Sequence, residues 1–302
     1  MIISKRRQKM ADRAASAAIW AMISEAAITP KPGLVDRANT GSHRDMDFFT
    51  LIDSASALLP WFRDCALAGF DSAAARRPGI SPQALFESLR PGGREAEALM
   101  KNATGGINAH KGYIFCLGIL CAAYGRLCRG AVKPDLAGLA EFSKAMTKDL
   151  LEDFARPGKE EKASHGETVY AQNGISGIRG EVSQGFPLIT GHAMPLLRQM
   201  LKKGHSLNDC GTAVLLHLMA RAEDTNIIYR GGVEAFRSIQ GELQKFLAGD
   251  PGIETIKKKA EEMDREFIKK NISPGGCADL LGITFFLYRI TETQDYRRRP
   301  FP

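Results

Sequence analysis

Residues 113–127 read YIFCLGILCAAYGRL, and this stretch decides the fold class. It is too long for a β-strand, and its apolar residues face every direction of a helix instead of forming one stripe. A helix that is apolar all round is buried on all sides. The sequence therefore predicts a buried helix at the centre of the protein.

Helical spacing of apolar residues continues outward from this stretch in both directions. From residue 11 to residue 27 the apolar positions recur every three or four residues. The pattern stops at Thr29-Pro-Lys-Pro-Gly33, where two prolines and a glycine form a rigid turn. Further helices are expected at about 46–68, 82–101, 135–154, 190–203, 207–222, 232–248, 252–270 and 277–290.

The predicted fold class is all-α, because the period-two alternation of β-strands is missing throughout the chain. We expect about ten helices in one large domain, or in two helical subdomains with the site between them. The helical domain is predicted to cover residues 11–290, between a disordered basic N-terminus at 1–10 and a basic C-terminal tail at 291–302. The polar, glycine-rich stretch 156–180 is predicted to be a mobile loop or a lid.

The overall composition is that of an ordinary soluble globular protein, with 44% apolar and 25% charged residues among 302 and a net charge of +7. A basic chain favours phosphorylated substrates and other polyanions. No apolar run approaches the ~20 residues that span a bilayer, and the start MIISKRRQKMADR has no apolar core typical of a secretion signal. Six cysteines without a C-x-x-C pair indicate reduced thiols. We therefore expect a cytoplasmic protein that does not act at a membrane.

Residues capable of chemistry gather in five short segments rich in glycine or proline, at 29–47, 105–112, 177–187, 223–232 and 271–279. Glycines let backbone N–H groups approach phosphate oxygens, and a helix that follows adds the favourable field of its N-terminus. Arginine forks and lysine charges complete such a cradle. The predicted substrate and phosphate contacts are Lys31, Arg37, Lys111, Arg179, Asn226, Arg230, Gly275 and Gly276.

Carboxylates beside these cations suggest Mg²⁺, which binds one or two carboxylates together with phosphate oxygens. The predicted metal ligands are Asp45, Asp47, Glu223 and Asp224. Each pair also has a purely structural interpretation. Asp45 serves equally as a helix N-cap with Asp47 in the first turn, and the other pair as a solvated helix end.

Several familiar signatures are absent. The segment GGINAHKG at 105–112 contains a lysine, but its spacing differs from the Walker-type phosphate loop G-x-x-x-x-G-K-[ST]. The chain also contains no G-x-G-x-x-G, H-E-x-x-H or G-x-S-x-G motif. These absences count against a conventional kinase or dehydrogenase.

Taken together, the five segments resemble the triphosphoribosyl-dephospho-coenzyme A synthase family, whose members serve citrate lyase and malonate decarboxylase. The resemblance runs from about residue 15 to 290 and follows the family's order. The matching text is Thr29-Pro-Lys-Pro-Gly-Leu-Val-Asp36, Asp45-Met-Asp-Phe-Phe49, Gly106-Ile-Asn-Ala-His-Lys-Gly112, Arg179-Gly-Glu181, Gly185-Phe-Pro187, Asp224-Thr-Asn226, Arg230-Gly-Gly232, Asn271-Ile-Ser-Pro-Gly-Gly276 and Ala278-Asp-Leu-Leu281.

This resemblance implies an unusual use of ATP, as a donor of sugar. The 2′-hydroxyl of 3′-dephospho-coenzyme A attacks C1′ of ATP's ribose, adenine leaves, and the triphosphate stays on the transferred sugar. The product is the precursor of the prosthetic group of an acyl carrier protein, and a carrier-protein transferase would receive it. Because the family's product is α-linked and ATP is β-linked, a single displacement with inversion is the economical mechanism.

Breaking a ribosyl C–N bond requires a base for the incoming hydroxyl and a proton or hydrogen bond for the leaving adenine. Asp36 and Glu181 are the candidate bases, since each lies beside an arginine and glycine-rich backbone. His110, helped by Asn108, is the candidate acid because a histidine titrates near neutrality. An ordinary capping role for His110 remains open.

Two other functions stay open at the level of sequence. An ATP-dependent phosphotransferase on a helical scaffold would release ADP or AMP instead of adenine. A non-enzymatic helical module would bind RNA through its basic ends, but the acidic segments argue against a nucleic-acid partner. An apolar helix face serves a core and a homodimer interface equally well, so the oligomeric state is also open.

Overall fold

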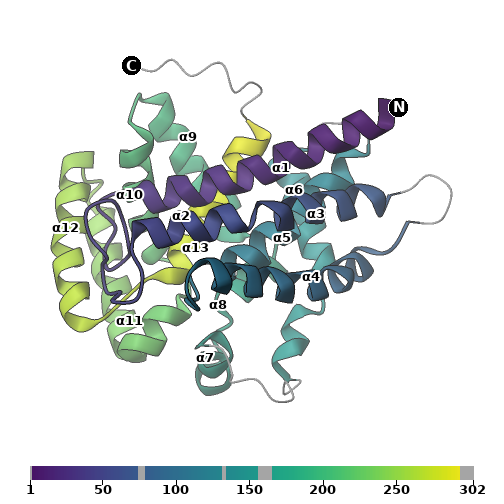
Figure 1. Cartoon of the computed structure of the whole chain (residues 1–302). Coiled ribbons are helices and arrows are strands. Elements are labelled where there is room, and N and C mark those ends of the chain that lie inside the picture. The colour runs from purple at the N-terminus through teal and green to yellow at the C-terminus, as the bar shows by residue number, and fades with distance from the viewer. Residues whose placement is uncertain (1, 74–78, 131–133, 156–164, 293–302) are drawn as a thin grey trace.

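The computed structural model describes residues 2–73, 79–130, 134–155 and 165–292, and every regular element within them is helical (Figure 1). The order is α1 (Ile2–Ala27), α2 (Phe48–Ala57), α3 (Leu59–Asp71), α4 (Pro82–Ala103), α5 (Lys111–Cys128), α6 (Leu136–Met146), the 3₁₀ helix η1 (Leu150–Ala155), α7 (His165–Asn173), α8 (Gly177–Ser183), the π-helical turn η2 (Ile189–Ala193), α9 (Met194–Lys202), α10 (Leu207–Met219), α11 (Thr225–Ala248), α12 (Ile253–Lys270) and α13 (Gly275–Thr291). The predicted all-α class is confirmed.

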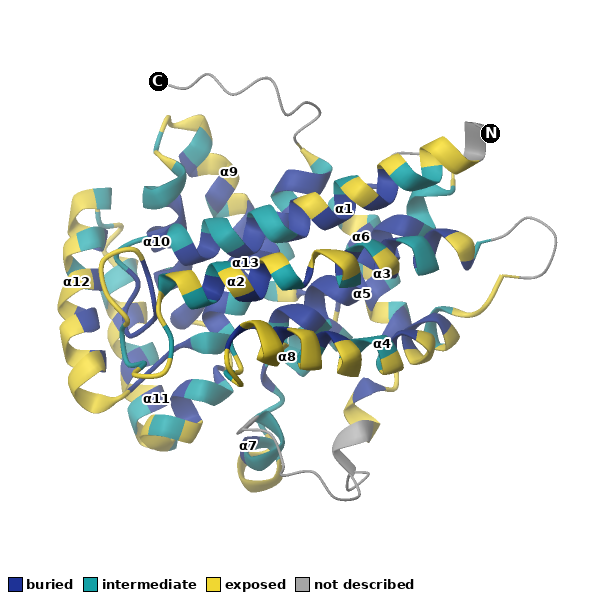
Figure 2. Cartoon of the chain, in the orientation of Figure 1, coloured by how far each residue is buried: buried dark blue, intermediate teal, exposed yellow. Residues whose placement is uncertain are grey.

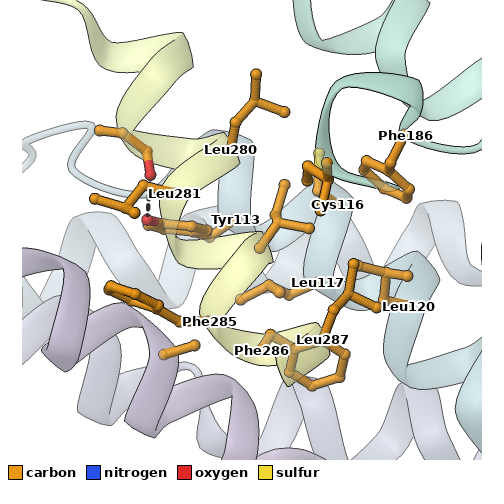
Figure 3. Packing of buried hydrophobic residues seen from close by; sticks show 14 of the residues in the cluster. Tyr113, Cys116, Leu117, Leu120, Phe186, Leu280, Leu281, Phe285, Phe286 and Leu287 are labelled. Carbon is orange, nitrogen blue, oxygen red and sulfur yellow. Dashed lines mark hydrogen bonds between the residues drawn. The ribbon is translucent and has the colours of Figure 1, made fainter. Parts of the chain in front are cut away.

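Helix α5 is the predicted central helix. Its side chains are buried from Tyr113 to Gly125 with one half-buried exception, and it contacts α1, α3, α4, α6 and α13. Figure 3 shows its residues interleaved with those of α13. The two helices can approach closely at Gly282 because glycine has no side chain. A Cβ there would lie 2.1 Å from the hydroxyl oxygen of Tyr113. One continuous hydrophobic core extends from Met10 to Ile290, so the described helices form a single domain.

By length and composition alone, α5 also qualifies as a membrane-spanning helix. In this fold, however, 67% of that stretch is buried inside the protein, and Figure 2 shows more exposed helices around it. A helix enclosed by other helices does not face lipid. Its apolar character is explained by its place in the core.

The expected helix at 46–68 is two helices, α2 and α3, separated at Leu58. Pro60 lies in the first turn of α3, where its missing N–H group is tolerated. The cap of α2 is Asp47 and not Asp45. The Asp47 carboxylate accepts the N–H of Thr50 at 2.8 Å, and the Thr50 side chain reaches back to the Asp47 backbone.

The expectation of a disordered N-terminus at 1–10 is wrong for the described residues, because α1 already begins at Ile2. Two of the basic side chains there contact other helices. Arg6 donates to the carbonyl of Cys128 at 2.7 Å, and Arg7 pairs with Asp71. The predicted C-terminal tail lies almost entirely outside the described residues, since α13 ends at Thr291.

Three further boundaries differ from expectation. The expected helix at 135–154 ends at Met146 and is followed by η1. Part of the expected loop at 156–180 is helical, as α7 and the start of α8, while residues 156–164 lie outside the described residues. Helix α11 begins at Thr225, seven residues before the predicted start, and is kinked at Gly232 (φ 83°, ψ 166°).

Candidate active site

The segment 28–47 between α1 and α2 is a loop organised around Asp36. The Asp36 carboxylate accepts four hydrogen bonds from this same loop: from the Thr29 hydroxyl (2.6 Å) and from the N–H groups of Lys31 (3.1 Å), Ala38 (2.7 Å) and Asn39 (3.1 Å). Both carboxylate oxygens are therefore already used, and Asp36 is buried. This geometry suits a residue that shapes the loop, and counts against its predicted role as a base.

Helix α12 holds the same loop in place, at the left edge of the molecule in Figure 1. Asp264 accepts the N–H of Gly33 and the side-chain amide of Asn39, both at 2.9 Å. Gly33 has a φ of +67°, and a Cβ there would lie 2.2 Å from the Ile272 carbonyl oxygen. Only glycine fits this position.

The far end of the loop is tied to the segment that precedes α13. Arg230 on α11 donates to the Ser42 carbonyl (3.1 Å) and to the Asn271 side chain (3.2 Å). A ring nitrogen of His43 lies 2.9 Å from the Ser273 hydroxyl. The first, fourth and fifth predicted segments are thus brought together.

The N-termini of α5, α11 and α13 meet beside this loop. Asp224, the N-cap of α11, accepts the N–H groups of Asn226 (2.9 Å) and Ile227 (3.1 Å) in α11 and that of Cys277 (2.8 Å) in α13. At the other helix pair, a Cβ on Gly112 of α5 would lie 1.9 Å from a carboxyl oxygen of Asp279 of α13. Three helix N-termini therefore direct partial positive charge into one region.

Gly275 and Gly276 open α13 at this junction, two residues before the predicted start of that helix. A Cβ on Gly275 would lie 2.8 Å from the side-chain nitrogen of Asn226, and one on Gly276 would lie 3.2 Å from Asp224. The two glycines therefore let the start of α11 pack directly on the start of α13. Exposed N–H groups of such a turn are suited to phosphate oxygens.

Lys31 is fully buried and forms an ion pair with Glu25 of α1, with Nζ and Oε1 2.5 Å apart. Burial raises the pKa of Glu25, and the charge of Lys31 opposes that shift. Tyr113, whose hydroxyl donates to the Ala278 carbonyl at 2.8 Å, lies beside the same pair. The predicted phosphate contact of Lys31 is therefore not available in this structure, because its charge is neutralised by Glu25.

His110 is the N-cap of α5 and is buried. Its Nδ1 lies 2.8 Å from the Ser54 hydroxyl of α2, and its backbone N–H donates to the sulfur of Met100. Burial, and to a smaller extent the charge of Lys31, lower the pKa of His110 to about 3. The imidazole is neutral at physiological pH, which makes it a poor proton donor and counts against the predicted acid role.

Glu181 on α8 is half-buried and accepts the N–H of Leu188 at 3.2 Å. Burial and the neighbouring carboxylate of Glu223 raise the pKa of Glu181 to about 7, against the lowering effect of that hydrogen bond. Glu181 and Asp279 both influence the thiol of Cys116 electrostatically, so the third segment lies near the helix junction. A carboxyl that titrates near neutrality is suited to general base catalysis.

The remaining predicted residues lie around this junction with more exposure. Arg37 donates to Asn208 at 3.0 Å, Lys111 pairs with Glu97 at 3.1 Å, and Arg179 pairs with Glu167 at 3.1 Å. Asn108 and Glu223 are exposed, and no hydrogen bond or ion pair is found for either side chain within the described residues.

The carboxylates predicted for Mg²⁺ divide into two kinds. Asp45 and Asp47 are exposed, and Asp45 lies 3.8 Å from a ring nitrogen of His43. Asp224 is buried and already accepts three backbone N–H groups. Within the described residues no group of three or more His, Cys, Asp or Glu side chains is arranged to hold a metal by itself. The exposed pair fits a cation that brings phosphate oxygens with it, whereas Asp224 does not.

Two carboxyl groups at the junction were not among the predicted site residues. Glu25 is the partner of Lys31, and Asp279 packs against Gly112. The available signals were an acidic residue near the end of the helix 11–27 and an aspartate three residues after the Pro-Gly-Gly turn. Only the fold reveals which helix each of them faces.

Comparisons with known proteins identify the family of this chain. A family model described as ATP:dephospho-CoA triphosphoribosyl transferase matches residues 11–298. The chain belongs to this family. Among relatives of this transferase, a 2-(5''-triphosphoribosyl)-3'-dephosphocoenzyme-A synthase of Pectobacterium atrosepticum is 39% identical over 268 residues, covering 89% of this chain and 86% of the relative.

Two further relatives of the transferase have the same printed name, the first with the prefix "probable". The Vibrio cholerae protein is 38% identical over 277 residues, covering 91% of this chain and 87% of its own length. The Klebsiella pneumoniae protein is 36% identical over 286 residues, covering 92% and 90%. No solved structure matches the chain.

Proposed function

We propose that this transferase moves the triphosphoribosyl group of ATP to the 2′-hydroxyl of 3′-dephospho-coenzyme A and releases adenine. The observation that supports it best is the junction of three helix N-termini beside a carboxyl, Glu181, that titrates near neutrality. Helix N-termini bind a triphosphate without hydrolysing it, and the carboxyl supplies the base that a hydroxyl nucleophile needs. The family assignment agrees with both substrates.

In this mechanism Glu181 accepts the proton of the attacking 2′-hydroxyl. The new bond forms between that oxygen and C1′ of ATP's ribose, while the bond from C1′ to the adenine nitrogen breaks. Positive charge develops on the ribose in the transition state, as in glycoside hydrolysis.

The triphosphate contacts available in this arrangement are the N–H groups at the start of α13, together with Asn226, Arg37 and Lys111 at its edges. Mg²⁺ fits this proposal, with Asp45 and Asp47 as the residues that would hold it and neutralisation of phosphate charge as its contribution. The product would then be passed to a transferase that loads a carrier protein in the cytoplasm.

The decisive experiment is incubation of the protein with ATP, Mg²⁺ and 3′-dephospho-coenzyme A, followed by chromatography of the nucleotides. Sugar transfer gives free adenine in equal amount to the new coenzyme derivative. A phosphotransferase would instead give ADP or AMP and no adenine, and that result would refute the proposal. ATP alone, without acceptor, is the control for simple hydrolysis.

A further inference from the structure

Asp279 occupies a specific place at the junction of α5 and α13. It lies one turn into α13, and its carboxyl packs against the backbone of Gly112, two residues beyond His110. A Cβ at Gly112 would lie 1.9 Å from Oδ2 of Asp279, so any larger residue would displace this carboxyl. The fold therefore places an acidic group against the first turn of α5.

Unlike Glu25, Asp224 and Asp36, Asp279 has no hydrogen-bond or ion-pair partner among the residues that the structure describes. Glu25 pairs with Lys31, Asp224 accepts three backbone N–H groups, and Asp36 accepts four hydrogen bonds. In the part of the chain that the structure describes, no hydrogen bond or ion pair is found for Asp279.

The carboxyl of Asp279 is nevertheless reachable. The residue is half-buried, and among the described residues Ser143 Oγ is the one fully enclosed side-chain polar atom that lacks a partner. The oxygens of Asp279 therefore retain contact with the exterior. An unpartnered group that is partly desolvated and still accessible is poised to meet a ligand.

The charges around Asp279 favour its protonated form. Burial raises the pKa of Asp279 well above its usual range, and the carboxylates of Glu25 and Asp224 raise it further. The other titratable groups facing it are Tyr113, Cys116 and Cys277, whose own pKa values are raised by burial. They are neutral at physiological pH, so none of them compensates a negative charge on Asp279. A carboxylic acid whose pKa is raised in this way holds its proton more firmly than usual and is suited to proton donation.

We propose that Asp279 is the catalytic acid that protonates adenine as it leaves. This proposal rests on the proposed function. The bond from C1′ to the adenine nitrogen breaks with its electron pair on adenine, and the proton of Asp279 moves to a ring nitrogen of the base. The bond from the 2′-oxygen to C1′ forms, and its proton moves to Glu181. Return of that proton to Asp279 through solvent restores the enzyme.

The test compares two donors in the variant Asp279→Asn. With ATP, adenine release should fall ~10²-fold or more, because the amide has no acidic proton to give. A donor methylated at N7 of adenine already has a positive charge on its base, which leaves as a neutral molecule. With this donor Asp279→Asn should differ from the unmodified protein by less than about threefold.

Glu181→Gln is the matched control, since a lost base slows transfer from both donors equally. Thermal unfolding shows whether Asp279→Asn is folded, and Asp279→Ser serves as a second variant if it is not. Equal impairment of folded Asp279→Asn with both donors would overturn the acid role. A tenfold higher Mg²⁺ requirement without rescue by the methylated donor would overturn it too, in favour of metal binding.

The failure of this proposal is distinguishable from failure of the proposed function. If the unmodified protein releases no adenine from ATP, the function itself is refuted and the acid role with it. If adenine is released but the donor comparison shows no rescue, only the role of Asp279 is refuted.

Discussion

At the scale of single residues, Lys31 and Glu25 form a buried ion pair within the candidate site. Both side chains are almost completely enclosed, with exposed fractions of 1% and 4%. A buried pair contributes little relative to apolar residues of the same size, but removing one partner leaves an uncompensated buried charge. The pair also connects the loop 28–47 to α1.

We therefore expect Lys31→Met to lower the free energy of unfolding by about 3–5 kcal/mol. Adding Glu25→Gln to Lys31→Met should recover at least part of this loss, because the stranded carboxylate is removed. Urea unfolding of the two variants measures the difference. A double variant no more stable than Lys31→Met would mean that the charge of Glu25 is not the cause.

The activity is predicted to depend on pH through Glu181, since burial and the charge of Glu223 raise the pKa of Glu181 to about 7. A base acts only when deprotonated, so the rate of adenine release should rise as pH increases through about 7. Glu181→Gln should remove this rise and lower the rate ~10²-fold. The measurement is kcat/KM for 3′-dephospho-coenzyme A from pH 5 to 9.

The variant Glu223→Gln provides the matched comparison, because it removes the like charge beside Glu181 and leaves the base in place. The pKa of Glu181 should fall, so the rise in rate should move to lower pH while the plateau stays within a few-fold. A rise that does not move would show that Glu223 has no electrostatic influence on the base.

At the scale of elements, the start of α11 depends on Asp224, which also holds the start of α13 through the N–H of Cys277. Asp135 caps α6 through the N–H of Gly138 at 2.8 Å, and no predicted or proposed site residue lies on α6. Both aspartates cap a helix by accepting backbone N–H groups, but only Asp224 lies at the junction of α11 and α13. Comparing them separates helix stability from catalysis.

Asp135→Ala and Asp224→Ala should each lower the free energy of unfolding, the first by about 1 kcal/mol and the second by more because it loses a contact to a second helix. Adenine release should be retained in Asp135→Ala and largely lost in Asp224→Ala, whose helix junction is disrupted. Chemical unfolding and activity assays test both variants. Equal activity of the two variants would show that the reaction does not depend on the helix junction.

At the scale of the whole molecule, a partly buried histidine whose pKa is lowered makes the free energy of unfolding depend on pH. Burial and the charge of Arg221 lower the pKa of His217 on α10 to about 4, against 6.5 in the unfolded chain. Between these values the unfolded state takes up a proton that the folded state does not. The contribution of neutral His217 to the free energy of unfolding is fully present above pH 6.5 and is lost as pH falls through about 4.

The variant His217→Gln should therefore show a shallower loss of stability than the unmodified protein between pH 6.5 and 4. The difference in slope is at most about 1.4 kcal/mol per pH unit. Guanidinium unfolding at a series of pH values measures it. Parallel curves for the two proteins would show that His217 takes up its proton in both states.

Local sequence patterns were sufficient for most helices, because apolar spacing, caps and prolines act over a few neighbouring residues. The buried helix at 113–127 became α5, and the expected helix at 252–270 became α12 almost unchanged. The boundary errors have local causes too. The split at Leu58 is explained by Pro60, which lies in the first turn of α3. Helix α11 continues through a kink at Gly232, although glycines at this point in the sequence are typical of a turn.

Function was accessible from sequence where several motifs in order carry a family resemblance. Individual roles were less accessible, because a role depends on what each side chain faces. Asp36 and Asp224 look like reactive carboxylates in the sequence, yet the fold uses both as hydrogen-bond acceptors for backbone N–H groups. Lys31 looks like a phosphate contact, yet it neutralises Glu25.

The sequence by itself therefore determined the all-α class and the central helix and predicted the segments of the site, since these follow from periodicity and residue type within short windows. Only the tertiary structure decided that Asp279 lies against the start of α5 with no hydrogen-bond partner among the described residues. The Asp279 carboxyl packs against Gly112, and Glu25 and Asp224 help to raise its pKa. These three residues come from three other parts of the chain. Desolvation and electrostatic coupling act through space, and their strength is fixed only when distant helices pack together.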